Sequence, residues 1–214
     1  MKKFLPTKIF LVRHGKSEWN GQKRVSGQLD PHLSKKGIQQ SHWLARTLRY
    51  EGLSAIYTSP LTRAVDTAKP TAAEHCLPIK TRDTLKEIHF GVLQGRFRDG
   101  RDRVAQQLWR KREKDKQCYR VPAGESFSDL KRRVIPCVNE ILEYEEGGLI
   151  LIVGHRSTNR VVLGALMQWP EDSWCSLDLG HKYLYEIFVG DRRRVATICL
   201  DRHHGGYRHE GFIM

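Results

Sequence analysis

Three short runs of apolar residues, almost uninterrupted by polar ones, constrain the fold of this chain most strongly. They occupy residues 9–12, 55–57 and 149–153, and segments with helical periodicity separate them. Strands that are apolar on both faces are typical of a parallel sheet covered by helices on both sides. Two further runs, residues 183–189 and 195–200, flank a turn near Gly190 and predict a β-hairpin. We therefore predict an α/β fold, a three-layer α/β/α sandwich whose mostly parallel central sheet has an antiparallel strand near the C-terminus.

Serine residues mark the starts of two predicted helices. Ser34 can cap a helix that carries Ile38 and the apolar positions 44, 45 and 48 on one side. Ser126, followed three residues later by Asp129, resembles a capping box. The helix that it opens has apolar residues on one face, at positions 127, 130, 134, 138 and 141. We expect Pro136 to kink this helix rather than end it.

The length and the cysteines indicate an ordinary intracellular protein. The chain has 214 residues without a repeat or a linker, and we predict one domain over residues 1–214. No apolar run approaches the ~20 residues that a membrane helix needs, so we expect no membrane partner. The start of the chain has the charge of a signal peptide, but Lys8 and Arg13 interrupt its apolar core, and no signal-cleavage site follows. Five cysteines without a C-x-x-C pair or zinc spacing predict reduced thiols and a cytoplasmic location.

The charge of the chain predicts an anionic partner without naming it. There are 37 Lys and Arg residues against 24 Asp and Glu residues, a formal net charge of +13. Such a chain attracts nucleic acid, anionic membranes or phosphorylated metabolites, although charge that merely aids solubility gives the same composition. The interleaved aromatic and basic residues of single-strand binders are lacking, which argues against a nucleic-acid partner.

Two of the apolar strands run directly into a histidine that has an arginine beside it. The first strand leads into Arg13 and His14, and the strand at 149–153 leads through a glycine into His155 and Arg156. Ligands of open parallel sheets bind beyond the carboxyl ends of the strands. If the two strands are neighbours, the two imidazoles face each other there. The alternative is that each histidine is a hydrogen-bonded group of the core.

These residues belong to a longer series of motifs, which resembles the histidine phosphatase superfamily. Members of that family include the cofactor-dependent phosphoglycerate mutases. The resemblance extends from about residue 9 to the C-terminal hairpin, with several elements in the same order. They are LVRHGKSEWN at 11–20, SG at 26–27, LSKKG at 33–37, SPLTRAVDTA at 59–68, EIHFGVLQG at 87–95, GES at 124–126 and VGH at 153–155.

The resemblance implies a role in phosphoryl transfer for a set of catalytic residues. His14 is the implied nucleophile, which forms a phosphohistidine, and His155 is the second imidazole, which donates to the transferring group. Glu87 is the implied general acid for the leaving alkoxide, a role that suits a carboxyl partly buried beside Phe90. A neutral imidazole is available near pH 7, and nearby arginines favour that neutral form.

The resemblance also implies phosphate ligands. Arg13 and Arg63 clamp the phosphoryl oxygens, because a guanidinium fork matches phosphate geometry. Asn20 matches a position that contacts phosphate in the family. Two arginines and two histidines supply the positive charge without metal, and we expect neither a metal nor a cofactor.

Further positions are candidates for binding the rest of the substrate. Ser26 and Gly27 match one of the motifs, and Glu125 with Ser126 is either part of the site or only a helix start. Arg156 departs from the family, where many members have a small residue after the second histidine. Its side chain is either a third phosphate ligand or turned outward into a salt bridge.

The segment between Glu87 and Glu125 bears on the choice of reaction. We call residues 96–120 the lid segment; over 96–116 it has nine basic and four acidic residues, a net charge of +5. Mutases of the family carry a longer insertion here, and a short lid admits water. We therefore predict a phosphatase for small phosphomonoesters, a phosphoric monoester hydrolase. A cofactor-dependent phosphoglycerate mutase and a non-catalytic binder of phosphorylated or nucleic-acid partners are the alternatives.

The substrate and the assembly are less constrained. The basic lid segment predicts a small phosphorylated metabolite with further acidity, such as a phosphorylated carboxylate or a bisphosphate. Equally, Leu108 and Trp109 could pack an amphipathic helix whose charges only face solvent. The sequence leaves the oligomeric state open.

Overall fold

A central sheet of seven strands organises the computed structural model, which describes residues 5–200 and 206–213. Its order is β3-β2-β4-β1-β5-β6-β7. The strands β1 (Thr7–Arg13), β2 (Ala55–Thr58), β3 (Ile79–Thr81) and β4 (Leu149–Gly154) are parallel to one another. The strands β5 (Tyr183–Val189), β6 (Arg194–Cys199) and β7 (Arg208–Glu210) pair antiparallel. The predicted α/β class and the antiparallel hairpin are confirmed, and β7 adds a short strand that the sequence did not predict.

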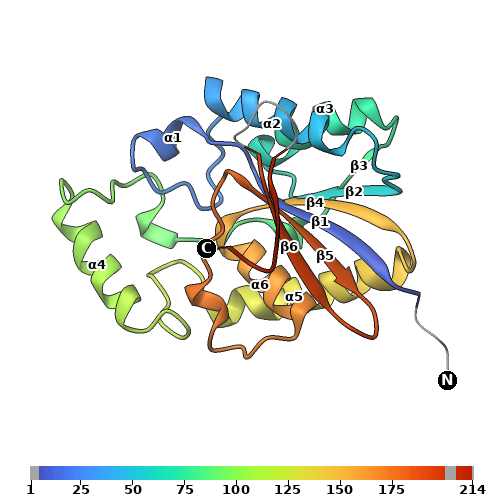
Figure 1. Ribbon diagram of the computed structural model, residues 1–214. Coiled ribbons are helices and arrows are strands. Elements are labelled where there is room, and N and C mark those ends of the chain that lie inside the picture. Colours follow the sequence, from blue (N-terminus) through green and yellow to red (C-terminus); the bar gives the residue numbers. More distant parts are fainter. Residues whose placement is uncertain (1–4, 201–205, 214) are drawn as a thin grey trace.

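Helices cover both faces of the sheet, as the apolar strands require (Figure 1). On one face lie α2 (Lys35–Leu48) and α3 (Thr62–Glu74), and on the other α5 (Phe127–Tyr144) and α6 (Arg156–Met167). Alternate residues of β1 enter the two cores: Ile9 and Leu11 pack with α5 and α6, and Phe10 and Val12 pack with α2 and α3. Burying one such side chain stabilises the fold by roughly 1.5–3 kcal/mol.

The predicted helix starts are observed, with one difference in a helix face. The Ser34 hydroxyl accepts from the Gly37 N–H, and Ser126 forms the reciprocal capping box with Asp129. All five apolar positions of the α5 face are buried, and α5 continues through Pro136. Ile38, predicted on the apolar side of α2, is instead 49% exposed. The buried stripe of α2 runs through positions 37, 40, 41, 44, 45 and 48, so residue 38 faces away from the sheet.

The remaining elements gather at the end of the sheet toward which β1 and β4 run (Figure 1). They are α1 (Glu18–Gly21), α4 (Arg103–Lys114) and the short 3-10 helices η1 (Asp83–Leu85), η2 (Gly91–Leu93) and η3 (Trp174–Ser176). The lid segment thus contains one helix, α4. Across the described residues, every helix is too short or too polar to cross a bilayer.

Candidate active site

The pairing of β1 with β4 brings the two strand-terminal histidines together. The register aligns Arg13 with Gly154, and the His14 N–H donates to the Gly154 carbonyl at 2.9 Å. The ring centroids of His14 and His155 lie 5.1 Å apart, with the ring planes tilted by 55°. Two segments separated by about 140 residues therefore place their imidazoles side by side at the carboxyl ends of two central strands.

The hydrogen bonds of His14 determine which of its nitrogens is available. Its Nδ1 lies 2.7 Å from the Gly15 carbonyl, which can only accept, so the proton of the neutral ring is on Nδ1. The Nε2 atom keeps its lone pair. Burial holds the pKa of His14 well below its ordinary value, and the charge of Arg63 adds to this effect. A neutral imidazole with a free Nε2 is a competent nucleophile.

His155 has the opposite tautomer and a less accessible position. Arg63 Nη2 lies 3.4 Å from its Nδ1 and can only donate, so the proton is on Nε2, which donates to the Ser59 hydroxyl at 2.7 Å. Burial, followed by the charges of Arg63 and Arg13, lowers the pKa of His155 well below its ordinary value. The residue is fully buried and lies behind His14, outside the lining of the cavity described below.

Two arginines flank the imidazoles with donors that the protein does not use. Arg63 is fully buried; its terminal nitrogens donate to the carbonyls of Leu29 (2.7 Å) and Gly27 (2.6 Å). Within the described part of the chain, the Nε atoms of Arg13 and Arg63 have no partner. Burial lowers the pKa of Arg63, and that of Arg13 to about 9. Because unsatisfied buried donors cost free energy, this arrangement favours an anion.

The Glu87 carboxylate is held at the N-terminus of α6. Its oxygens accept from the N–H groups of Ile88 (2.9 Å) and Ser157 (3.1 and 3.2 Å). The residue is 8% exposed and faces the same cavity as His14. Helix N-termini favour negative charge, which explains why an acid is tolerated here.

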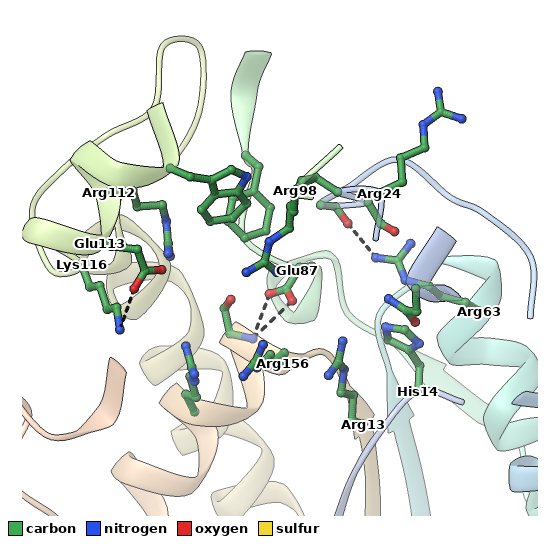
Figure 2. A pocket seen from close by; sticks show the side chains of 18 residues that line it. Arg13, His14, Arg24, Arg63, Glu87, Arg98, Arg112, Glu113, Lys116 and Arg156 are labelled. Carbon is green, nitrogen blue, oxygen red and sulfur yellow. Dashed lines mark hydrogen bonds and ion pairs between the residues drawn. The ribbon is translucent and has the colours of Figure 1, made fainter. Parts of the chain in front are cut away.

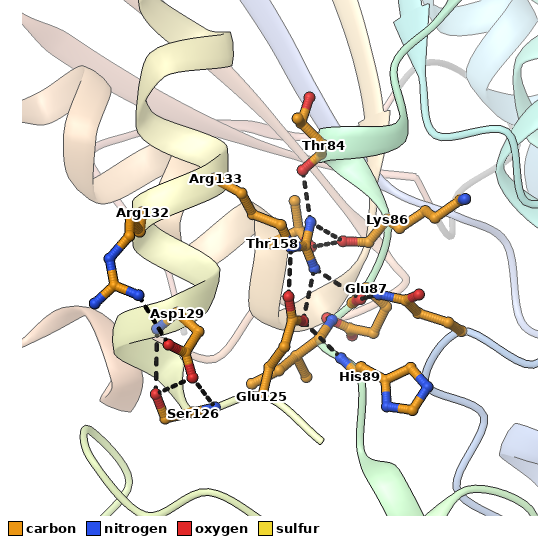
Figure 3. A network of polar contacts seen from close by, with 12 residues as sticks. Thr84, Lys86, Glu87, His89, Glu125, Ser126, Asp129, Arg132, Arg133 and Thr158 are labelled. Carbon is orange, nitrogen blue, oxygen red and sulfur yellow. Dashed lines mark hydrogen bonds and ion pairs between the residues drawn. The ribbon is translucent and has the colours of Figure 1, made fainter. Parts of the chain in front are cut away.

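Arg133 of α5 holds the backbone that carries Glu87 (Figure 3). It donates to the carbonyls of Thr84 (2.6 Å), Lys86 (3.0 Å) and Glu87 (3.0 Å), and it pairs with Glu125 at 2.8 Å. Burial alone would raise the pKa of Glu125, but its hydrogen bonds to Arg133 and the His89 N–H bring it below the ordinary value. The structure thus places Glu125 in the support of the Glu87 turn and Ser126 at a helix start.

A cavity of about 250 Å³ opens in front of His14 (Figure 2). Eight of the nine residues predicted for the site line it, all except His155: Arg13, His14, Asn20, Ser26, Gly27, Arg63, Glu87 and Arg156. Asn20 accepts from the Ser17 N–H through Oδ1, so its amide NH₂ is the group left to donate. Arg156 forms the predicted salt bridge, with Asp178 at 2.6 Å, and it also lines the cavity; its role as a third phosphate ligand stays a prediction.

Sequence reasoning missed several residues of this site. His181 lies edge-on to His14 with 5.3 Å between centroids, and its Nδ1 donates to the His14 carbonyl at 2.8 Å. Burial, then the charge of Arg13, lowers the pKa of His181 to about 2. No motif marked this residue. The cavity lining also includes Arg98, Arg112 and Lys116, for which the basicity of the lid segment was the signal. It further includes Trp109, Arg24 and Arg160, which no sequence feature assigned to the site.

The fold is that of an α/β protein, and the carboxyl ends of its central strands carry two neighbouring imidazoles and a strongly cationic cavity. The family model of the histidine phosphatase superfamily (branch 1) matches residues 9–198, and the chain belongs to this family of enzymes. It is 35% identical over 163 residues to a protein of Yersinia pestis named "Probable phosphoglycerate mutase GpmB", covering 76% of this chain and 75% of the relative.

The chain is also similar to solved structures of phosphatases. A mycobacterial glucosyl-3-phosphoglycerate phosphatase, solved with VO₃, is similar with a TM-score of 0.74 and 27% identity, covering 88% of this chain and 96% of that one. The α-ribazole phosphatase of Shigella flexneri aligns over 97% and 100% of the two chains with a TM-score of 0.79. Its identity of 23% supports the shared fold alone.

Proposed function

We propose that this protein is a phosphatase that hydrolyses small phosphomonoesters through a phosphohistidine on His14. The observation that carries the proposal is the neutral His14 ring, which keeps a lone pair on Nε2 and lines a cavity together with arginines that have unused donors. In the first step, Nε2 attacks phosphorus and the P–O bond to the alcohol breaks. Arg13, Arg63 and Asn20 bind the phosphoryl oxygens and stabilise the charge of the transition state.

Proton transfer in this cycle is assigned to Glu87. Its protonated carboxyl gives a proton to the departing alkoxide, and the resulting carboxylate then takes a proton from the attacking water. The P–N bond breaks, His14 regains its lone pair, and the products are the alcohol and phosphate.

Buried His155 supports the reaction from behind the nucleophile. Its lone pair on Nδ1 accepts from Arg63, and its proton on Nε2 is engaged by Ser59. In this role His155 orients the side chain of Arg63, which binds the phosphoryl group, before substrate is bound. Donation to the phosphoryl group itself, as the resemblance implies, requires that bound phosphate draw the ring into the cavity.

A second candidate is phosphoglycerate mutase activity, which the 35% identical Yersinia relative favours. The mycobacterial phosphatase structure and the single helix of the lid segment favour hydrolysis. Supplying 2- or 3-phosphoglycerate with a bisphosphoglycerate primer separates the two reactions. Fast interconversion with little release of phosphate would identify the mutase.

The nucleophile is tested by trapping the intermediate. In rapid-quench experiments with a ³²P-labelled phosphomonoester, we expect an acid-labile, base-stable phosphoenzyme, and turnover that persists in EDTA. His14→Ala should lower turnover by at least about 10³-fold and abolish the label, because the variant lacks the nucleophilic imidazole. His42→Ala, an exposed histidine of α2, is the matched control and should behave like the wild type. Substantial turnover by the His14 variant would exclude this nucleophile, and salt-sensitive nucleic-acid binding without any turnover would support the non-catalytic alternative.

A further inference from the structure

The cavity carries a second group of cations besides the phosphate ligands Arg13 and Arg63. We call Arg98, Arg112, Arg156 and Arg160 the outer subsite. Arg98 precedes α4, Arg112 lies on α4, and Arg156 and Arg160 lie at the start of α6. Figure 2 shows Arg98, Arg112 and Arg156 entering the same space from these different elements.

Most of these guanidinium groups pair with no carboxylate in the described part of the chain. Among the described residues, the side chains of Arg98 and Arg112 make no hydrogen bond or ion pair; they lie over the Trp109 ring, 4.4 and 5.5 Å from its centroid. Arg160 donates through Nε to the Leu177 carbonyl at 2.5 Å, and it pairs with no carboxylate among the described residues. Arg156 alone has one, Asp178.

The burial of Arg112 makes its lack of an anionic partner costly. Arg112 is only 6% exposed, and burial with the nearby charge of Arg156 lowers the pKa of Arg160 to about 10. Buried charges without partners are unfavourable and are retained in proteins where a ligand neutralises them. The indole N–H of Trp109 is also buried and unsatisfied among the described atoms, so it adds a neutral donor to the same wall.

The charge of the whole cavity exceeds what one phosphate can neutralise. Eight cationic side chains line it (Arg13, Arg24, Arg63, Arg98, Arg112, Lys116, Arg156, Arg160) against two carboxylates, Glu87 and Glu113. Counting every carboxylate as charged gives the smallest excess, which is six and becomes four when Asp30 and Asp178, which pair with Arg63 and Arg156, are included. A phosphomonoester brings about two negative charges. About two positive charges therefore remain.

We propose that the outer subsite binds a second anionic group of the substrate, so that the enzyme acts on small molecules with an anion at each end. The inference rests on the proposed phosphatase function and specifies its substrate class. The remaining charge is that of a second phosphate, which makes a bisphosphate the favoured substrate and a phosphorylated carboxylic acid the weaker one. Guanidinium groups bind both through the same paired N–H donors.

The test uses linear alkanediol bisphosphates of two to six carbons, the corresponding monophosphates, and ω-phosphooxy carboxylates of the same lengths. We expect kcat/KM for the best bisphosphate to exceed that for its monophosphate by about 100-fold or more, as two or more charge-assisted hydrogen bonds would give. A stronger preference for the carboxylates would support a second anion and identify it as a carboxylate. The absence of any preference for a second anion, at every length, would overturn the inference.

Single substitutions distinguish direct binding at the outer subsite from an effect of the overall surface charge. Arg112→Gln should lower the ratio of bisphosphate to monophosphate kcat/KM by about 10-fold or more, the effect of losing one charge-assisted hydrogen bond. Arg110→Gln is the matched control, because Arg110 is exposed on the same helix and outside the cavity lining. If the two variants change the ratio equally, the arginines act only through the surface potential and the inference fails. Arg160→Gln on α6 repeats the test should the Arg112 variant not fold.

Affinity measurements with ligands that cannot be hydrolysed test the outer subsite independently of the proposed phosphatase reaction. Alkane bisphosphonates and monophosphonates contain C–P bonds that a phosphatase does not cleave, so calorimetry measures their affinity without turnover. Tighter binding of the bisphosphonate, lost in Arg112→Gln, supports the outer subsite even if every ester proves inert. Turnover of esters with equal affinity for both phosphonates would leave the phosphatase in place and reject the outer subsite.

Discussion

The position of the proton on each buried histidine decides which nitrogen can react. A carbonyl partner on Nδ1 leaves His14 with a nucleophilic Nε2, whereas Arg63 on Nδ1 leaves His155 with a protonated Nε2. His181 is also fixed, because its Nδ1 donates to the His14 carbonyl. Two histidines that look equivalent in the sequence are therefore chemically different in the fold. Among the described histidines, only His14 combines a free lone pair with a place in the cavity wall.

The assignment of the general acid is tested at the same scale. Glu87→Gln should lower kcat/KM for simple alkyl phosphates by about 10²–10⁴-fold, because an alkoxide leaves slowly without a proton. For p-nitrophenyl phosphate, whose leaving group needs no proton, the loss should be below about 10-fold. The kinetics of both esters are measured side by side, with Glu143→Gln on the exposed side of α5 as the control. Equal losses on the two esters would contradict the assignment.

At the scale of elements, close contact between the loop after β1 and α2 holds His14 in place. A Cβ atom built on Gly15 would lie 2.5 Å from the Gly37 carbonyl oxygen, and one on Gly37 would lie 2.2 Å from that of Lys16. Glycine at both positions allows this approach. Gln40 of α2 also accepts from the Lys16 N–H at 2.8 Å. The motif residues 33–37 thus build the support of the nucleophile.

This contact predicts the effect of adding one methyl group. Gly37→Ala should destabilise the protein by about 1–3 kcal/mol, since the backbone of the loop must move. The same shift should reduce turnover, because the loop continues directly from His14. Urea unfolding and steady-state kinetics measure the two effects. Gly52→Ala is the matched control, with no atom within 4 Å of its added Cβ, and an equal effect of both substitutions would refute this account.

At the scale of the whole molecule, the buried histidines of the site make folding stability sensitive to acid. His14, His155 and His181 are buried as neutral rings, and burial lowers the pKa of each in the folded state. In the unfolded chain the histidine pKa is about 6.5. Below that pH the unfolded state binds more protons than the folded state, so stability falls as the pH falls. Above it the three rings are neutral in both states, and their effect disappears.

The expected size of this effect follows from linkage. From about pH 6.5 downward, each of the three histidines should remove up to about 1.4 kcal/mol of unfolding free energy per pH unit. The fall between pH 7.5 and pH 5.5 should therefore be about 4 kcal/mol in total. Urea unfolding in phosphate-free buffer measures it, because bound phosphate would add its own stabilisation. His181→Gln should reduce the fall by about a third, whereas His42→Gln should leave it as it is; a stability independent of pH over this range would contradict the prediction.

The order of strands and helices could be read from the sequence because it depends on local patterns. The apolar runs became β1, β2 and β4, and Ser34, Ser126 and Asp129 cap helices through groups only three residues away. Most of the lining residues that were predicted were found for a different reason, since they belong to a series of motifs in a fixed order. Ile38 was misplaced because a short apolar pattern does not determine which side of a helix faces the sheet.

By itself, then, the sequence determined the element types, their order, and the histidines and arginines that end the central strands, because those properties depend on neighbouring residues. Only the tertiary structure decided that His155 lies behind His14 and that His181 lies beside it. It also decided that Arg112 and Arg160, from helices far apart in the chain, share one cavity. These relations depend on how whole elements pack across the sheet. No local pattern carries that information, because the packing is the joint result of burial over two cores.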